Sequence, residues 1–150
     1  MRHTIKAHKL TELILEVFRI NGAIINTGNM LIEDLGLTSA RWQVLGALKN
    51  RPITVSEISR QMGLSRQNVQ RIANRLIQDG FIETIENPSH RRAKLCSLTL
   101  LGEEAIEEIT KRQIVWANKI SEDVNLENLE ITLSELKNFR FELEKQHEEK

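Results

Sequence analysis

Hydrogen-bonding side chains are concentrated in residues 65–75, which read "SRQNVQRIANR". From 66 to 78 the chain has three arginines and five side-chain amides, but no lysine and no acid. Arginine matches the O6 and N7 atoms of guanine, and asparagine or glutamine matches the N6 and N7 atoms of adenine. A helix face that is only solvated usually mixes Glu with Lys. These residue types predict a surface that binds the base edges of DNA, and a solvated polar face without readout is the alternative.

The apolar residues of the same segment predict a helix over 65–79 with one buried side. Val69, Ile72, Ala73, Leu76 and Ile77 follow the i, i+3, i+4, i+7, i+8 spacing of a single stripe. The polar residues then lie on the opposite side, and the first residues of such a recognition helix enter the major groove. The predicted DNA-binding residues of this helix are Ser65 (also its N-cap), Arg66, Gln67, Asn68, Gln70, Arg71 and Arg75.

Two other short segments are predicted to contact DNA. Arg91 and Arg92 lie in the tip of an expected hairpin, where arginine can enter a narrow minor groove. A solubilising loop is the alternative for this tip. Thr54 and Ser56 begin a short helix and are expected to meet backbone phosphates, although Thr54 is already explained as a helix cap.

The elements around these residues have the order of a winged helix-turn-helix. A helix over 39–50 is followed by "TVSE" at 54–57, a capping box that opens a short helix to about Met62. Gly63 allows a sharp turn into the helix over 65–79. After Gly80, "FIETI" (81–85) and "KLCSLT" (94–99) alternate as strands do, and "ENPSHRRA" between them contains turn formers. We therefore expect two strands joined by a long basic tip.

Long helices flank this lobe on both sides. Apolar residues in 10–25 predict one helix ending near Asp34, a second is expected from Leu100 to Asp123, and Asn125 is expected to cap a third. Leucines of the last helix have nearly heptad spacing, which favours a partner helix and hence a homodimer. The expected fold is mostly α with a small β-hairpin wing. Its predicted divisions are 1–37 (N-terminal dimerisation helix), 38–99 (DNA-binding lobe) and 100–150 (C-terminal dimerisation helices).

The charge distribution supports this division. Net charge is zero over the 150 residues, with 21 bases and 21 acids. Residues 38–100 nevertheless hold ten Lys and Arg against four Asp and Glu, whereas residues 101–150 hold seven against thirteen. A basic middle beside an acidic end predicts a polyanion-binding lobe on a separate scaffold.

Several classes of function lack their sequence signals. No Walker A motif, Rossmann glycine run or HExxH motif is present, and the histidines are scattered, so we expect neither an enzyme nor a metal or cofactor site. The polar N-terminus and the absence of a long apolar run predict a cytoplasmic protein without membrane association. The single cysteine, Cys96, lies in the strand "KLCSL" and is expected to be structural. An oxidant sensor that uses Cys96 is an alternative.

The sequence resembles the MarR family of bacterial winged-helix transcription regulators over nearly its whole length. The resemblance rests on "LGLTSARWQVLGAL" (35–48), "TVSEISRQMGLSRQNVQRIANRLIQDGFIE" (54–83) and "LTLLGEEA" (98–105). It implies a homodimer whose two lobes bind a pseudo-palindromic operator. It also implies control by a small ligand, often aromatic or phenolic, bound between the lobe and the dimer region.

The family's wing pattern, Asp-x-Arg followed by Leu-Thr, falls here on His90, Arg91 and Arg92. Arg92 therefore looks like the wing arginine, and His90 departs from the usual acid that helps to hold the wing. The resulting hypothesis is a DNA-binding transcriptional regulator, expected to be a repressor. A winged helix that serves protein–protein assembly is the alternative from another class.

Overall fold

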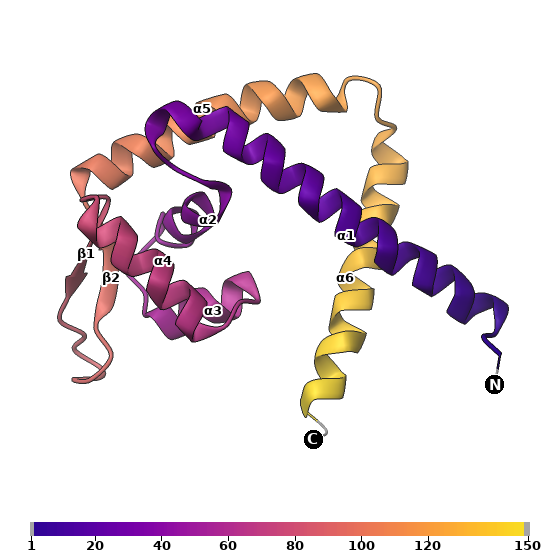
Figure 1. Ribbon diagram of the computed structural model, residues 1–150, viewed down its shortest axis with the longest axis horizontal. Helices are drawn as coiled ribbons and strands as arrows, with labels where there is room; N and C mark the ends of the chain where they lie inside the picture. Colours follow the sequence, from indigo (N-terminus) through magenta and orange to yellow (C-terminus); the bar gives the residue numbers. More distant parts are fainter. Residues whose placement is uncertain (1, 149–150) are drawn as a thin grey trace. The chain divides into compact units, whose positions relative to one another are not determined.

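The computed structural model describes residues 2–148 and the side chains as far as Lys145. It is mostly helical with one antiparallel hairpin, which confirms the predicted fold class. The chain order matches that of a winged helix-turn-helix with a long helix on each side (Figure 1). The elements are α1 (Ile5–Ile32), the 3₁₀ helix η1 (Glu33–Leu35), α2 (Ser39–Ala47), α3 (Val55–Met62), α4 (Arg66–Gln78), β1 (Ile82–Ile85), β2 (Leu95–Leu98), α5 (Leu100–Ser121) and α6 (Leu126–Glu148).

Local sequence signals set the helix boundaries. Thr54 and Glu57 form the predicted capping box of α3, and Ser65 caps α4 by accepting a hydrogen bond from the Asn68 amide. Between these helices Gly63 has φ +65°, a left-handed conformation that a side chain would strain. Caps and glycine together fix the turn that sets α4 against α3.

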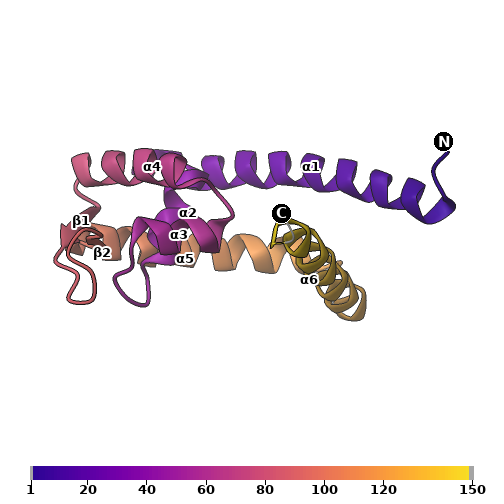
Figure 2. The same ribbon diagram turned by 90° about the horizontal axis from the view of Figure 1, so that it is seen from below.

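One hydrophobic core joins α2, α3, α4, the hairpin and the first half of α5. Figures 1 and 2 both show α2 between α4 and this part of α5. Each surrounding element contributes side chains that are almost fully excluded from solvent, and burial of this kind is the main stabilising term in folding. The buried apolar residues are Ile32, Leu37, Val44, Leu45, Leu48, Ile53, Ile58, Val69, Ile72, Ala73, Leu76, Ile82, Cys96, Ala105, Ile106 and Ile109.

The hairpin carries an extra pairing that the sequence did not indicate. Strands β1 and β2 pair with Ile82 opposite Leu98 and Thr84 opposite Cys96. Ile53, just before α3, forms an isolated bridge with Cys96, with backbone N–O distances of 2.8 and 3.2 Å. This bridge connects the base of the wing to the start of the helix-turn-helix.

Two sequence expectations need correction. Ile77 was expected in the buried stripe of α4 but is 37% exposed, because it lies about a quarter turn from the centre of that stripe. Helix α2 ends at Ala47 rather than at 50. Its C-cap is Leu48, so the helix stops before the "NRP" segment that was expected to end it.

Helix α1 is attached to the lobe near its C-terminal end. The Ser39 hydroxyl donates to the Ile25 carbonyl oxygen (2.8 Å), and the Ser39 amide donates to Asn29 Oδ1 (2.7 Å). Arg112 of α5 donates to the Leu31 carbonyl oxygen (2.9 Å) and makes a bidentate pair with Asp34. The hydrogen bonds that Arg112 donates to the Asp34 carboxylate hold the pKa of Asp34 below its usual value.

The described chain forms two compact units, the first reaching Arg112 and the second beginning at Gln113. The N-terminal half of α1 leaves Leu13, Val17 and Phe18 exposed. In the second unit, α6 leaves its heptad-spaced leucines exposed. Both helices therefore present apolar side chains to solvent in the single chain, and the predicted boundaries at 37/38 and 99/100 stay predictions.

Gly102 allows the start of α5 to lie directly against the hairpin. Thr99 Oγ1 donates to the Gly80 carbonyl oxygen (2.6 Å), and the Thr99 amide donates to the Phe81 carbonyl oxygen (3.1 Å). A Cβ at 102 would collide with that Phe81 carbonyl oxygen, which is backbone and cannot rotate away. A glycine is thus required at this junction of wing and α5.

The substitution Gly102→Ala is expected to lower the free energy of unfolding by about 1–3 kcal/mol, the usual cost of inserting an atom into a packed site. Urea denaturation measures this change. Gly46→Ala is the matched control, because Gly46 lies in α2 with no heavy atom within 4 Å of the added Cβ. The control should be neutral or stabilising by up to about 1 kcal/mol. Equal effects of the two substitutions would contradict the account.

Candidate nucleic-acid interface

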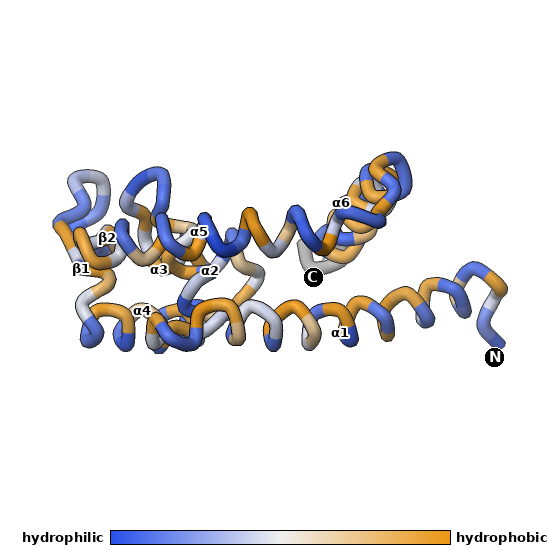
Figure 3. The backbone as a smooth tube through the Cα atoms, turned by 90° about the horizontal axis from the view of Figure 1, so that it is seen from above, coloured by the Kyte–Doolittle hydropathy of each residue, from blue (hydrophilic) through white to orange (hydrophobic). Residues whose placement is uncertain are grey.

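The outer face of α4 carries the predicted base-reading side chains. Val69, Ala73 and Leu76 are fully buried, so the opposite side of the helix faces solvent (hydrophilic edge of α4 in Figure 3). On that side Arg71 donates to Asn68 Oδ1 (3.0 Å), and Gln70 Nε2 donates to Asn74 Oδ1 (2.8 Å). These i,i+3 and i,i+4 pairs reduce the number of conformations that a ligand would have to select.

Most of the predicted residues line one of two hollows on this side of the lobe. A cavity of 560 Å³ lies between the start of α3, the start of α4 and the hairpin. A shallower hollow of 580 Å³ runs along α4, and Gln67 and Gln70 line both. The first includes Thr54, Ser56, Arg66, Gln67, Gln70 and Arg92; the second includes Ser65, Gln67, Asn68, Gln70 and Arg71.

Lys94 is a residue of this surface that the sequence analysis did not select. It lines the first cavity together with Arg66 and Arg92. The feature of the sequence that could have indicated Lys94 is its position at the start of the second strand, beside the basic tip. The sequence alone does not show that this end of the strand faces α3. The Ile53–Cys96 bridge supplies that proximity.

Arg75 and Arg91 lie outside both hollows. Arg75 Nε pairs with Asp79 Oδ2 at 3.0 Å, and Asp79 also meets Arg41 of α2 at 3.5 Å. The Arg75 side chain is still 56% exposed, so the pair can open toward a ligand at little cost. Arg91 is exposed in the wing tip.

Thr54 uses its side chain within the α3 cap. Its hydroxyl oxygen accepts a hydrogen bond from the Glu57 amide (3.2 Å). The same hydroxyl donates a hydrogen bond to Glu57 Oε2 (3.1 Å). The Thr54 amide, followed by the Arg51 guanidinium, holds the pKa of Glu57 below its usual value. A contact from Thr54 to DNA would compete with this cap, whereas Ser56 is not engaged in it.

The wing tip is held by Asn87, the predicted turn-forming Asn of "ENPSHRRA", through a hydrogen bond across the loop that the sequence did not indicate. Asn87 Nδ2 donates to the Ala93 carbonyl oxygen (2.8 Å) across the loop, and Asn87 Oδ1 accepts from the Ser89 amide (3.0 Å). Asn is a common turn former for this reason. The loop is therefore closed at its base by an amide, although His90 stands where the family pattern has an acid.

Cys96 is buried, as expected for a structural residue. It is 3% exposed, and burial raises the pKa of its thiol. Reactive cysteines need access and a stabilised thiolate, and Cys96 has neither. This environment argues against the oxidant-sensing alternative.

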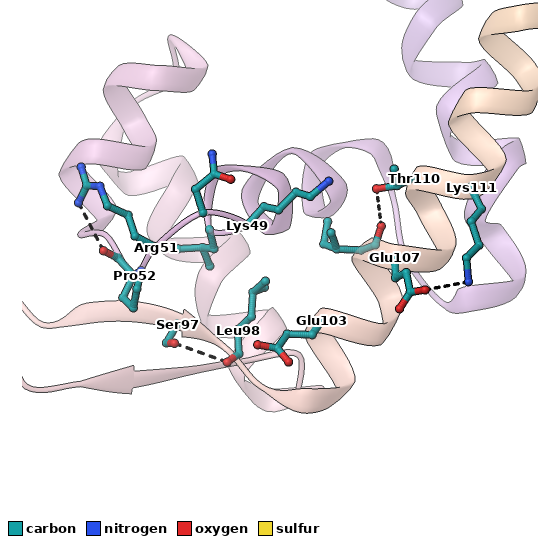
Figure 4. A pocket seen from close by; sticks show the side chains of 12 residues that line it. Lys49, Arg51, Pro52, Ser97, Leu98, Glu103, Glu107, Thr110 and Lys111 are labelled. Atoms are coloured by element: carbon teal, nitrogen blue, oxygen red, sulfur yellow. Dashed lines mark hydrogen bonds and ion pairs between the residues drawn. The ribbon is translucent and has the colours of Figure 1, made fainter.

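A third cavity, of 490 Å³, lies on another side of the lobe (Figure 4). Leu48, Leu98 and Ile106 give it apolar surface, with Lys49 from the segment after α2 and Glu103 from α5. Its volume is in the range of small-molecule sites.

The described residues contain no group of three or more His, Cys, Asp or Glu side chains placed to hold a metal ion. Within the same part of the chain, no helix has the length and apolar content needed to cross a membrane.

Comparison with known proteins identifies the family. A family model described as MarR family matches residues 35–93. The Mycobacterium tuberculosis protein Rv2011c is 35% identical over 129 residues, covering 86% of this chain and 90% of that protein. The chain belongs to the MarR family. It is a transcriptional regulator of that family, whose members are not enzymes.

Other relatives of this MarR-family protein have named roles. The transcriptional activatory protein BadR of Rhodopseudomonas palustris is 26% identical, covering 85% of this chain and 76% of BadR. The crystal structure of an Escherichia coli MarR mutant complexed with operator DNA superposes with a TM-score of 0.79. The two sequences are 20% identical, and the superposition covers 87% of this chain and 95% of the E. coli chain. At this identity the similarity shows a common fold.

The burial of Cys96 predicts that its thiol reacts slowly in the native protein. A disulfide-based thiol reagent should modify native protein at least about tenfold more slowly than protein in urea, because the thiolate must first be exposed. Mild peroxide should leave the affinity for duplex DNA unchanged. Equal reaction rates in the two states, or peroxide-dependent loss of binding that Cys96→Ser abolishes, would restore the sensor hypothesis.

Proposed function

We propose that this MarR-family protein is a homodimeric, sequence-specific DNA-binding repressor that acts in the cytoplasm on a pseudo-palindromic operator. Helix α4 enters the major groove, and the wing with Arg91 and Arg92 lies along the adjacent minor groove. The family assignment supports regulation of transcription. The operator-bound E. coli MarR mutant has the same fold, which makes duplex DNA the first ligand to test.

The observation that carries the proposal is the composition of the exposed side of α4. Its arginines and amides are the side chains that match base edges, and its first acid is Asp79 at the C-cap. The buried stripe on the other side fixes the helix so that these side chains point outward. Readout by Ser65, Arg66, Gln67, Asn68, Gln70 and Arg71 follows from that orientation.

The proposed dimer supplies a second recognition helix, which binds the second half-site of the operator. Exposed apolar side chains on α1 and α6 need a partner surface, and a second copy provides one in a closed, two-fold arrangement. Two recognition helices then lie roughly 34 Å apart, one turn of DNA, or a multiple of this. Dimerisation also doubles the number of phosphate contacts and steepens the dependence of affinity on salt.

A small ligand releases the repressor in this proposal. The support is the family resemblance and the 490 Å³ cavity between the segment after α2, β2 and α5. A ligand that binds better to a dimer with mismatched helix spacing shifts the population away from DNA. Because BadR is named an activatory protein, the direction of regulation is decided by a transcription assay with and without the protein.

A protein–protein assembly module is the competing function. Duplex binding measured at two salt concentrations separates the two, because phosphate contacts make the affinity of a DNA-binding lobe fall steeply with salt. Weak binding with little salt dependence would favour the assembly module.

Two arginine substitutions are expected to act differently on DNA binding. Arg71→Ala should relax specificity, lowering operator affinity by about 1–3 kcal/mol with little change on random duplex. Arg92→Ala should weaken binding to operator and to random duplex to a similar extent, because a wing arginine mainly responds to charge and groove shape. Lys111→Ala removes one charge from a lysine paired with Glu107 on α5 and serves as the control. Parental binding by both arginine variants would refute these site assignments.

Disruption of the α6 stripe is expected to reduce the assembly to a single chain. Sedimentation equilibrium should give the parent twice the 17.3 kDa chain mass. Leu136→Glu places a charge among the heptad leucines and should shift the protein toward 17.3 kDa. Asn138→Glu adds the same charge off that stripe and should leave the dimer intact. A monomeric parent, or a dimeric Leu136→Glu variant, would contradict the proposed interface.

A further inference from the structure

The side-chain amide of Gln70 is held by a neighbouring side chain on the outer face of α4. Its Nε2 atom donates to Asn74 Oδ1 at 2.8 Å, one helical turn further along the chain. Both side chains are exposed, and both line the hollow of 580 Å³ along α4. Asn74 lines this hollow without belonging to the predicted set of DNA-binding residues. We propose that Asn74 is a positioning residue, which orients the Gln70 amide so that Gln70 reads adenine.

The hydrogen bond to Asn74 restricts what Gln70 can offer to a base. A glutamine amide has two N–H donors and one carbonyl oxygen. Asn74 occupies one N–H, which leaves the second N–H and Oε1 for a ligand. Adenine presents the matching pair in the major groove, with its N6 amino group as donor and N7 as acceptor. Guanine presents two acceptors, O6 and N7, so the carbonyl oxygen of Gln70 would lie opposite an acceptor.

An amide without such a partner has to be ordered when it binds. Rotation of the Gln70 amide alone by 180° would place its oxygen against Asn74 Oδ1, and two acceptors do not form a hydrogen bond. The pair therefore favours one order of donor and acceptor before DNA arrives. Ordering one side chain of this kind in advance favours binding by about two- to tenfold.

The next residue along the helix has a different chemistry. Arg71 donates to Asn68 Oδ1 at 3.0 Å, and its guanidinium keeps further N–H donors and has no acceptor. A group with donors alone matches the two acceptors of guanine. Gln70 and Arg71 are consecutive, with Cα atoms about 3.8 Å apart, which is close to the base spacing of about 3.4 Å along one strand. We therefore expect adenine and guanine at neighbouring base pairs of each half-site.

The packing of α4 gives the Gln70–Asn74 pair a fixed place at the surface. Val69 and Ala73, which directly precede the two amides, are fully buried and hold the helix backbone at both positions. Among the described residues no carboxylate lines the hollow, so no acid competes there for the remaining N–H of Gln70. Gln67 lines the same hollow, but its amide has no hydrogen bond to a described side chain. The restriction by a partner is thus particular to Gln70.

This inference rests on the proposed function, because it requires that α4 reads bases. The probe is the operator recovered by selection from random duplexes, together with duplexes in which each base pair of the half-site is replaced in turn. Gln70→Ala in the full chain locates the base pair that Gln70 reads, as the position where the preference for adenine is lost. Arg71→Ala locates the guanine position in the same way.

The decisive variant is Asn74→Ala. It should lower the preference for adenine at the Gln70 position by about two- to tenfold for each half-site. The preference for guanine at the Arg71 position should stay parental, which gives a control within the same helix. In the Gln70→Ala background, Asn74→Ala should not change base preference further, since the amide that it orients is gone. Gln78→Ala removes an exposed amide of α4 that lines neither hollow, and it should reproduce the parent.

A second variant, Asn74→Asp, separates orientation from charge. The carboxylate keeps an acceptor oxygen for Gln70 Nε2 but adds a negative charge beside the DNA. Affinity for operator and for random duplex should therefore fall together, whereas the preference for adenine should be retained. Urea denaturation of Asn74→Ala should show parental or slightly higher stability, because alanine is a better helix former than asparagine. A changed preference in that variant then reflects the lost partner of Gln70.

The outcomes distinguish this inference from the proposed function. Parental adenine preference in Asn74→Ala, or in Gln70→Ala, would overturn the inference and leave the proposed function intact. A further loss of preference when Asn74→Ala is added to Gln70→Ala would also overturn it, because Asn74 would then contact a base directly. A parent without any sequence preference would refute the proposed function and this inference together.

Discussion

Burial of one side of α4 is the constraint on which the interface depends. Val69, Ala73 and Leu76 are fully excluded from solvent among residues of α2, α3 and the hairpin. Burying side chains of this size contributes roughly 1–3 kcal/mol each, so the helix cannot rotate about its axis without a large loss of stability. The arginines and amides on the other side therefore have a fixed direction. In the proposed function, base readout depends on this packing and on the Ser65 cap, which together place the N-terminal turn of α4 at the surface.

The wing is tied to the rest of the lobe at two places and closed within its own loop at a third, and these contacts decide where its charges lie. Cys96 is buried and bridged to Ile53 before α3, Thr99 and Gly102 lie against the chain at Gly80 and Phe81, and Asn87 closes the tip. Arg92 and Lys94 thereby lie next to the first turn of α4. Two elements far apart in sequence form one positive surface. The net +6 of the lobe is less informative than this convergence, because several of its arginines are neutralised by local acids.

Sequence reasoning was most successful where the signal is local. Thr54, Gly63, Ser65 and Asn125 were predicted as caps or turns, and all four have that role, because a cap depends only on residues three or four positions away. The hairpin strands were also predicted correctly. Lys94 and the Ile53–Cys96 bridge were missed because they depend on a contact between segments about 40 residues apart. Ile77 was misplaced because an i+8 position lies at the margin of a helical stripe, where tertiary packing decides exposure. The predicted contacts of the site residues with DNA, and the dimer, depend on molecules outside the single chain.

Selection from a pool of duplexes with a randomised core tests the central claim most directly. If the fixed outer side of α4 reads bases in a two-fold dimer, repeated binding and amplification should enrich one pseudo-palindromic sequence. Its half-sites should lie about 10 base pairs apart, centre to centre, or a multiple of one helical turn. A recovered pool without a common sequence, from protein that still binds duplex, would show that α4 contacts DNA without reading it. A pool that is not retained at all would contradict DNA binding itself.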